Sequence, residues 1–234
     1  MVRASLSTAE KAEVFNMEKY TVEQLQEFES HVIEYFEAGK IPGPIHLSHG
    51  NEVQLIKIFE DIHPDDWVLS TWRNHYHALL HGIPKDVLMD KILDGKSIST
   101  NSAEHRFLVS AIVGGIPPIA VGIAAGLKAN GSPRHVWCFV GDMCGSIGIF
   151  KDSQQYARLN DLPITFVIES NDLSTNTNTI ESWGYKEGEI TSDEFYCGRN
   201  LKPNEVIRIN DNTLYYHYER KYPHVGIGKK VVMS

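Results

Sequence analysis

The sequence predicts an α/β fold with a mostly parallel sheet flanked by helices, on the strength of three observations. Residues 134–176 read as strand, helix and strand, because two apolar runs flank an amphipathic segment. Residues 111–131 form an apolar stretch rich in small residues, as in a tightly packed helix. Residues 205–209 and 214–218 are two late strand-like runs joined by an Asn-Asp-Asn turn, which indicates a C-terminal hairpin of edge strands.

Length and composition are those of one globular domain. The chain has 234 residues, of which 42% are hydrophobic, and a formal net charge of −8 at pH 7, which argues against a nucleic-acid surface. The 3 cysteines lack zinc-ligand spacing, no apolar run could span a bilayer, and no signal-peptide pattern opens the chain. We therefore expect a cytoplasmic protein with an N-terminal arm over 1–20 and one domain over 21–234.

The first half of the chain is predicted to be mainly helical. Thr21 followed by Gln24 is a capping box, and the apolar spacing after it continues a helix to about residue 38. Later elements are a helix over 53–62, a short strand over 67–69, helices from about 71 and over 87–93, and a polar loop over 97–110.

The second half carries the strand–helix–strand unit. Pro117-Pro118 suits the start of a helix and Gly131 its end, and strands are expected over 135–140 and 162–168. A crossover of this length joins parallel strands, so both following turns lie at the carboxyl edge of the sheet, where open α/β sheets bind ligands. Residues 177–201 are polar and are expected to form a loop.

Those two turns carry oxygen ligands. The first offers the carboxylate of Asp142, and the second offers the amide of Asn171 and the free carbonyls after it. These are ligands that suit Mg²⁺ or Ca²⁺, and a helix starting after Asp142 could hold a phosphate. The alternative is an ordinary α/β turn that contains an aspartate by chance.

The same stretch resembles the thiamine diphosphate signature of Gly-Asp-Gly, a gap of this size and Asn-Asn. Here it reads Gly141-Asp142-Met143, then 26 residues, then Ser170-Asn171. The flanking sequence is most similar to the alpha chain of the thiamine diphosphate-dependent 2-oxoacid dehydrogenases of the pyruvate and branched-chain types. Met143 and Ser170 depart from the signature.

The resemblance implies thiamine diphosphate and Mg²⁺ as cofactors. It assigns the metal to Asp142, Asn171 and the carbonyl of Leu173. It also implies that Gly141, Met143 and Cys144 border the diphosphate, with the amide of Cys144 still available where Met143 replaces Gly.

Two further motifs are similar to the family in the same order. Trp72-Arg73-Asn74-His75 resembles a Tyr-Arg-x-His motif, which implies that Arg73 and Trp72 contact the diphosphate. Residues 111–131 resemble the segment whose start, Ala111-Ile112-Val113, touches the aminopyrimidine half of the cofactor. Ile112 is then the residue expected to hold the cofactor bent.

Three histidines are implied as catalytic residues. His46 lies in the phrase HLSHGNE, where the family carries a histidine facing the 2-oxoacid. His105 lies in the polar loop that runs over the active-site mouth in the family. His224, in RKYPHVG, resembles a late catalytic histidine, although beyond residue 176 the chain departs from the family.

The implied function is that of an alpha-type subunit that decarboxylates a 2-oxoacid and transfers the acyl group to lipoamide. The family draws an essential carboxylate from a pyrimidine-binding domain, so we expect a beta-type partner in a heterotetramer, and a lipoyl-bearing acyltransferase as a further partner. The alternatives are half of a split transketolase-like or 2-oxoacid decarboxylase enzyme, and a non-catalytic homologue. A generic metal–nucleotide binder lacks support, because no Walker-type loop is present.

Overall fold

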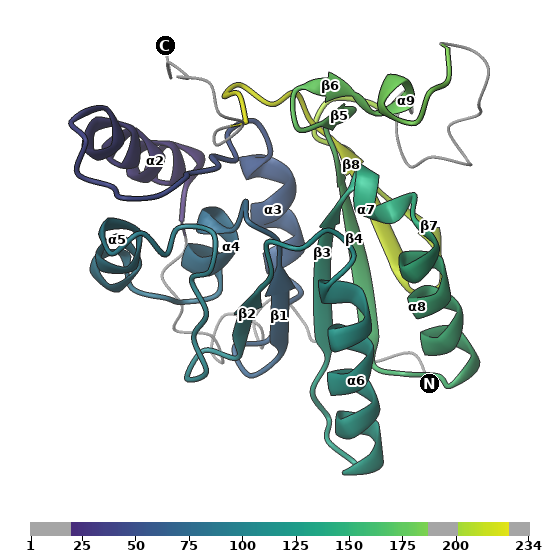
Figure 1. Cartoon of the computed structure of the whole chain (residues 1–234). Helices are drawn as coiled ribbons and strands as arrows, with labels where there is room; N and C mark the ends of the chain where they lie inside the picture. The colour runs from purple at the N-terminus through teal and green to yellow at the C-terminus, as the bar shows by residue number, and fades with distance from the viewer. Residues whose placement is uncertain (1–19, 187–200, 225–234) are drawn as a thin grey trace.

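The computed structural model describes residues 20–186 and 201–224, and its centre is a six-stranded sheet. The strand order is β2-β1-β3-β4-β8-β7, and every neighbouring pair is parallel except β7 and β8 (Figure 1). This confirms the predicted α/β class with a mostly parallel sheet. The antiparallel pair at one edge is the predicted hairpin.

The elements follow one another in a regular order along the chain. The strands of the large sheet are β1 (Trp67–Ser70), β2 (Phe107–Val109), β3 (Val136–Gly141), β4 (Ile164–Ser170), β7 (Val206–Asn210) and β8 (Thr213–His217). The helices are α2 (Val22–Glu37), α3 (Glu52–Phe59), α4 (His75–Leu80), α5 (Lys85–Leu93), α6 (Ile116–Ala129), α7 (Asp142–Gly145), α8 (Gly148–Leu159) and α9 (Thr179–Ser182). Two very short strands, β5 (Leu173–Ser174) and β6 (Thr177–Asn178), pair with each other.

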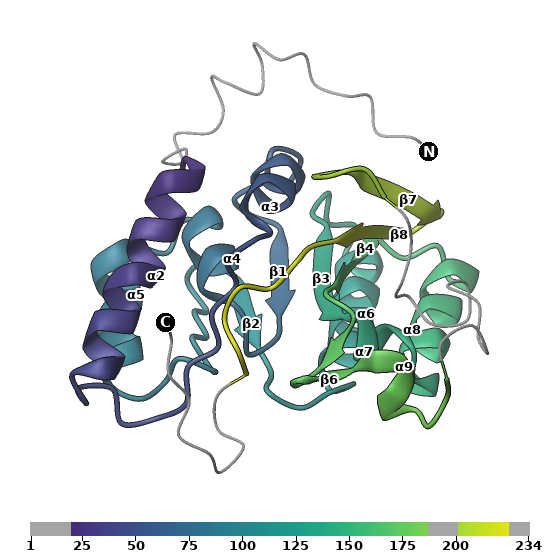
Figure 2. The same cartoon turned by 90° about the horizontal axis from the view of Figure 1, so that it is seen from above.

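Helices cover both faces of the sheet and give the domain two cores. Figures 1 and 2 show α2 to α5 gathered on one side and α6 with α8 on the other. Along β3, Phe139 faces the first core while Cys138 and Val140 face the second, as the two-residue repeat of a strand requires. All of β4 is buried, which explains its continuous apolar, β-branched sequence.

The first helix begins as its sequence predicts. Thr21 accepts a hydrogen bond from the backbone of Gln24, and the side chain of Gln24 accepts one from the backbone of Thr21. Two N–H groups at the helix start are thereby satisfied. The amphipathic helix that follows buries Leu25, Phe28 and Val32 in the first core.

Three parts of the chain differ from the sequence prediction. Residues 177–182 were expected in a polar loop, yet they form β6 and α9, because the side chain of Asn178 caps the start of α9 by accepting from the backbone of Ile180 and Glu181. Residues 107–109 were expected in a polar loop, yet they form β2, because Phe107 and Val109 are buried while the main chain pairs with β1. The helix expected from about residue 71 begins at His75. Residues 71–73 therefore lie in the turn between β1 and α4, at the carboxyl edge of the sheet.

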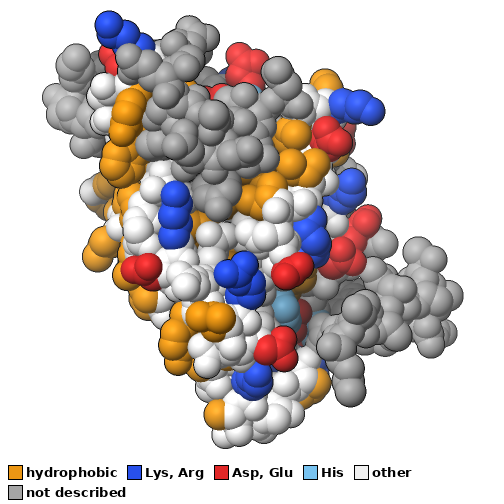
Figure 3. All heavy atoms as spheres, turned by 90° about the vertical axis from the view of Figure 1, so that its right-hand side faces the viewer, with side chains coloured by type: hydrophobic (Ala, Val, Ile, Leu, Met, Phe, Trp, Pro, Cys, Tyr) orange, Lys and Arg blue, Asp and Glu red, His pale blue; other side chains and the backbone are white. Residues whose placement is uncertain are grey.

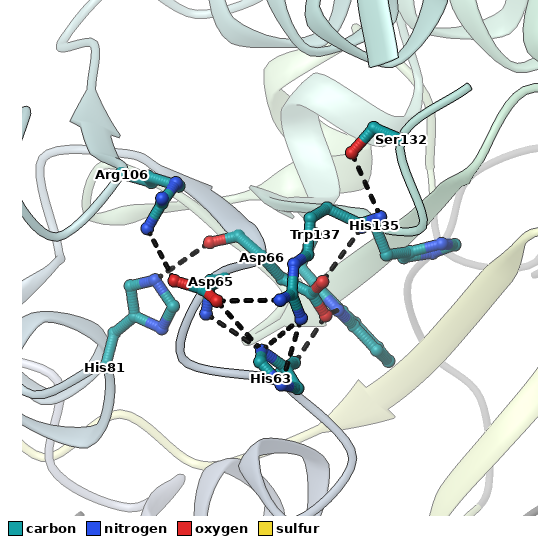
Figure 4. Close-up of polar contacts among 9 residues, drawn as sticks. His63, Asp65, Asp66, His81, Arg106, Ser132, His135 and Trp137 are labelled. Atoms are coloured by element: carbon teal, nitrogen blue, oxygen red, sulfur yellow. Dashed lines mark hydrogen bonds and ion pairs between the residues drawn. The ribbon is translucent and has the colours of Figure 1, made fainter. Parts of the chain in front are cut away.

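A polar network holds the opposite, amino edge together (Figure 4). The buried carboxylate of Asp66 accepts hydrogen bonds from the backbone of His135 at 2.9 Å and from the indole of Trp137 at 3.2 Å. Its neighbour Asp65 is paired with Arg106 at 2.9 Å and with Arg134 at 2.8 Å. The network joins the segments that enter β1, β2 and β3.

The surface carries charges of both signs. On the face shown in Figure 3, basic and acidic side chains are interspersed with apolar ones. Within the residues that the structure describes, no helix has the length and apolar character needed to cross a bilayer.

Candidate functional site

A pocket of about 130 Å³ opens at the carboxyl edge of the sheet, where the turns after five strands meet. Its lining residues are Thr71, Trp72 and Arg73 after β1; Ile112, Val113, Gly114 and Ile116 after β2; Gly141, Asp142, Met143 and Cys144 after β3; Asn171, Leu173, Ser174 and Thr175 after β4; and Arg220 and His224 after β8. Ligands of open α/β sheets bind at this edge.

Asp142 lies at the floor of this pocket, at the start of α7, and is 2% exposed. Its carboxylate accepts hydrogen bonds from the backbone N–H of Met143 at 2.8 Å and from the hydroxyl of Thr179 at 3.3 Å. Burial raises the pKa of Asp142 to about 6, because the charged form loses its water and the hydrogen bonds offset this only in part. A bound cation would reverse that shift.

The second turn presents Asn171 and Leu173 to the same pocket. The side-chain amide of Asn171 donates to the hydroxyl of Tyr218 at 3.0 Å, and its oxygen accepts from the backbone of Leu173 at 3.1 Å. Asp172 between them has a positive φ of 56°, and its carbonyl accepts from the backbone of Thr179. The turn is therefore held in one conformation from both sides.

Two arginines, Arg73 and Arg220, face the pocket from different segments. Arg73 donates from Nε to the carbonyl of Leu47 at 3.1 Å, and Arg220 donates from Nη2 to the side chain of Asn176 at 2.9 Å. Burial, followed by repulsion from Arg73, lowers the pKa of Arg220 to about 10. Two cations pointing at one cavity are a binding site for a multiply charged anion.

Three aromatic rings meet beside the pocket: Trp72 and His224 line it, and His46 is not a lining residue but contacts both. The imidazoles of His46 and His224 are stacked with centroids 4.1 Å apart, and Trp72 meets both rings edge-on at 6.1 and 6.0 Å. Burial is the main cause that lowers the pKa of His46 to about 2 and that of His224 to about 4, so both rings are neutral at pH 7.

Within the part of the chain that the structure describes, several nitrogens of these residues are buried and have no hydrogen-bond partner. They are Nδ1 of His46, Nδ1 of His224, Nε1 of Trp72 and Nε of Arg220. A buried polar atom without a partner is costly, so three of them on residues that line one cavity, with a fourth on the adjoining His46, indicate a ligand with several hydrogen-bond acceptors.

The rim of the pocket is apolar. Ile112 is 74% exposed and Val113 is 49% exposed, while Ala111 is exposed and lies just outside the lining. Cys144 is buried, which raises the pKa of its thiol to about 11. The side chain of Met143, where the signature has glycine, is part of the lining.

The structure thus brings most of the predicted site residues together, but His105 is not among them. His105 lies two residues before β2, at the amino edge of the sheet, and its Nδ1 bonds the hydroxyl of Ser102 at 2.8 Å. A catalytic role for His105 has no support from this geometry.

Sequence reasoning missed Arg220, Asn176 and Thr179. Arg220 belongs to the same segment, RKYPHVG, as His224, so its positive charge was a signal available in the sequence. The side chain of Asn176 accepts from both Arg220 and the backbone of His224, at 2.9 and 2.8 Å. That double contact depends on the fold and leaves no local pattern.

The pocket fits the diphosphate of the implied cofactor. Arg73, Arg220 and the unpartnered nitrogens are suited to phosphate oxygens. Across residues 20–186 and 201–224, no cluster of three or more His, Cys, Asp or Glu could hold a metal. The expected Mg²⁺ ligands contain a single carboxylate, Asp142, together with an amide and a carbonyl, which suits a metal that also binds phosphate oxygens.

Comparison with known proteins gives a family for this arrangement. The family model described as the dehydrogenase E1 component matches residues 20–188. The alpha subunit of acetoin:2,6-dichlorophenolindophenol oxidoreductase of Bacillus subtilis is 30% identical over 179 residues, which are 72% of this chain and 53% of that protein. The alpha subunit of the pyruvate dehydrogenase E1 component of Porphyra purpurea is 33% identical over 162 residues, 62% of this chain and 47% of that protein.

A third relative shows the same extent. The alpha subunit of the pyruvate dehydrogenase E1 component of Rickettsia prowazekii is 30% identical over 179 residues, 70% of this chain and 55% of that protein. The chain spans about half the length of the curated relatives it matches. With the family model covering most of the chain and the predicted motifs meeting in one pocket, the resemblance is confirmed, and the chain belongs to the dehydrogenase E1 component family.

Proposed function

We propose that this chain is the alpha-type subunit of a thiamine diphosphate-dependent 2-oxoacid dehydrogenase, which decarboxylates a 2-oxoacid and passes the acyl group to lipoamide. The observation that carries the proposal is the pocket that is lined both by two arginines and by the buried Asp142. When bound, thiamine diphosphate supplies the carbon nucleophile and the electron sink for loss of CO₂.

Each group of lining residues has a role in binding. Arg73 and Arg220 would hold the oxygens of the diphosphate by charge-assisted hydrogen bonds. Asp142, the side-chain oxygen of Asn171 and the carbonyl of Leu173 would hold Mg²⁺ beside it. A divalent cation next to the carboxylate of Asp142 would lower its raised pKa and restore its charged form.

The histidines are suited to the acceptor groups of a substrate. His46 and His224 are neutral at pH 7, so each ring can donate one hydrogen bond and accept another. Their unpartnered Nδ1 atoms are available for the carboxylate or keto oxygen of a 2-oxoacid. The indole of Trp72 can only donate, which favours a ligand oxygen over a ligand N–H.

We further propose that a beta-type chain with a pyrimidine-binding domain completes the site, in a heterotetramer that works in the cytoplasm and with a lipoyl-bearing acyltransferase. Two observations support a partner. The relatives reported above are named alpha subunits. Ile112 and Val113 expose apolar side chains at the mouth of the pocket, where a second chain or the cofactor would cover them.

The test is release of CO₂ from a panel of 2-oxoacids by the chain alone and with its co-expressed beta-type partner. The proposal predicts Mg²⁺- and cofactor-dependent release by the pair and none by the lone chain. Acyl transfer to a lipoyl domain identifies a dehydrogenase, whereas free aldehyde or transfer to a sugar phosphate identifies the split decarboxylase or transketolase-like alternatives. A pair that fails to bind the cofactor would identify a non-catalytic homologue.

A second candidate substrate is acetoin, because the relative from Bacillus subtilis is named for it and is as similar as the pyruvate dehydrogenase subunits. Acetoin carries a hydroxyl that must donate a hydrogen bond, and pyruvate carries a carboxylate that accepts. Turnover of acetoin and pyruvate by the same purified pair decides between them.

A further inference from the structure

The residues after β8 cross the pocket as a strap, which we define as residues 218–224. The strap leaves the sheet where the backbone N–H of Tyr218 donates to the carbonyl of Ser170 at 2.9 Å. It brings Arg220 to the pocket and ends at His224, which is stacked on His46. Half of the cationic charge of the site therefore depends on where this strap lies.

The strap lies directly against the loop of residues 46–51. The backbone N–H of Lys221 approaches the carbonyl of His49 at 3.5 Å, and the rings of His49 and Tyr222 meet edge-on at 5.3 Å. The same loop anchors the other cation, because Arg73 donates to the carbonyl of Leu47. One loop thus supports both arginines.

Gly50 lies where the loop and the strap approach each other closely. A Cβ atom on Gly50 would lie 2.2 Å from the carbonyl oxygen of Glu219 and 3.3 Å from its carbonyl carbon. Both are backbone atoms of the strap, so no side-chain rotation could relieve the clash. Gly50 also has a φ of +113°, a conformation that side-chain-bearing residues rarely adopt.

We propose that Gly50 is a positioning residue, whose missing side chain lets the strap lie close enough to place Arg220 opposite Arg73 and His224 on His46. The expected effect on ligand affinity rests on the proposed function, because it assumes that the two arginines bind one diphosphate. Any side chain at position 50 would lift the strap and move Arg220 away from Arg73.

The experiment compares Gly50→Ala with Gly131→Ala in the full chain. Gly131 is the control for a side chain at a positive φ, because its φ is +63° and its Cβ would meet no atom within 4 Å. Its φ lies in the left-handed region that L-residues can adopt, so the larger φ of +113° at Gly50 adds backbone strain to the clash with the strap. We expect Gly50→Ala to weaken binding of inorganic pyrophosphate with Mg²⁺ by about tenfold or more, as expected for the loss of a charge-assisted contact, and Gly131→Ala to leave it unchanged. The measurement is isothermal titration calorimetry.

A second readout does not depend on the ligand. Cross-relaxation in NMR between the ring protons of His46 and His224 should be present in the unaltered chain and in Gly131→Ala, and absent in Gly50→Ala. If the unaltered chain bound no pyrophosphate either alone or with its beta-type partner, the proposed function would fail, and this readout would still decide the role of Gly50. Retention of both pyrophosphate affinity and the histidine contact in Gly50→Ala would overturn the proposal.

A double substitution separates positioning from loss of stability. If Gly50 acts through Arg220, then adding Gly50→Ala to Arg220→Gln should weaken pyrophosphate binding little further, whereas additive losses would overturn the inference. If Gly50→Ala fails to fold, the unaltered chain still provides a test. Its Gly50 Hα protons must show NMR contacts to the ring of Tyr218, whose Cδ2 would lie 3.5 Å from a Cβ on Gly50, and absence of that contact would refute the close approach.

Discussion

Replacing Arg220 with glutamine should separate ligand affinity from stability. Without ligand, Arg220 donates a hydrogen bond to Asn176, and burial followed by repulsion from Arg73 lowers its pKa to about 10. Loss of the bond and relief of the repulsion oppose each other, so we expect the free energy of unfolding to change by no more than about 1 kcal/mol.

With ligand, the same substitution removes a charge-assisted contact. Such contacts contribute about 1.5–3 kcal/mol, which corresponds to a rise of roughly 10- to 150-fold in the Kd for Mg²⁺–pyrophosphate. Calorimetric titration measures the affinity, and urea unfolding measures the stability.

Arg208→Gln is the matched control for Arg220→Gln. Arg208 is exposed on β7, away from the pocket, and donates to the carbonyl of Asp211 at 3.0 Å. The Arg208→Gln substitution removes the same charge and should leave the Kd for Mg²⁺–pyrophosphate within about twofold, because charges on the surface are screened by salt. Equal losses of affinity in the two variants, or a loss in Arg220→Gln that follows a loss of stability, would refute the assignment of Arg220.

Three further predictions concern the metal, the amino edge and pH. Asp142→Ala should abolish Mg²⁺-dependent retention of thiamine diphosphate, measured by equilibrium dialysis, with an unchanged circular dichroism spectrum. Asp66→Ala should lower the free energy of unfolding by about 3 kcal/mol or more, because buried donors lose their acceptor. Asp65→Asn, in a half-exposed ion pair, should lower it by about 1 kcal/mol or less. Equal losses in urea unfolding would contradict the role of Asp66 in holding the amino edge together. The pKa values of His46 and His224 are lower in the folded than in the unfolded chain, so their contribution to stability is complete above pH 6.5 and is lost as the pH falls toward 4 for His224 and toward 2 for His46. The slope is at most about 1.4 kcal/mol per pH unit for each ring and smaller for the more exposed His224, and an unchanged slope in His46→Gln would contradict this account.

Local sequence signals were sufficient to predict an element wherever the structure of that element depends on its own residues. The capping box at Thr21 and Gln24, the buried strand β4 and the hairpin of β7 and β8 were all predicted, because each depends on neighbouring residues. Strand β2 was missed because it has 3 residues between polar ones, and pairing with β1 rather than its own pattern defines it.

The sequence predicted those site residues that lie in the turns directly after β1, β3 and β4. Asp142, Asn171 and Arg73 belong to these turns, and the parallel topology brings them to one edge. Arg220 depends on the course of the strap and on Gly50, a contact between residues far apart in the chain that no local pattern records. His105 was assigned because the corresponding loop of the family contains a histidine, and a loop match does not say at which edge of the sheet a residue lies.

The most direct test of the central claim is calorimetric titration of thiamine diphosphate into the full chain, alone and with its beta-type partner, with Mg²⁺ and with a chelator. The account predicts binding that requires Mg²⁺ and that is lost in Asp142→Ala and weakened in Arg220→Gln. Binding that is unaffected by the chelator and by Asp142→Ala would contradict a diphosphate–metal site at this pocket, as would the absence of binding even with the partner present.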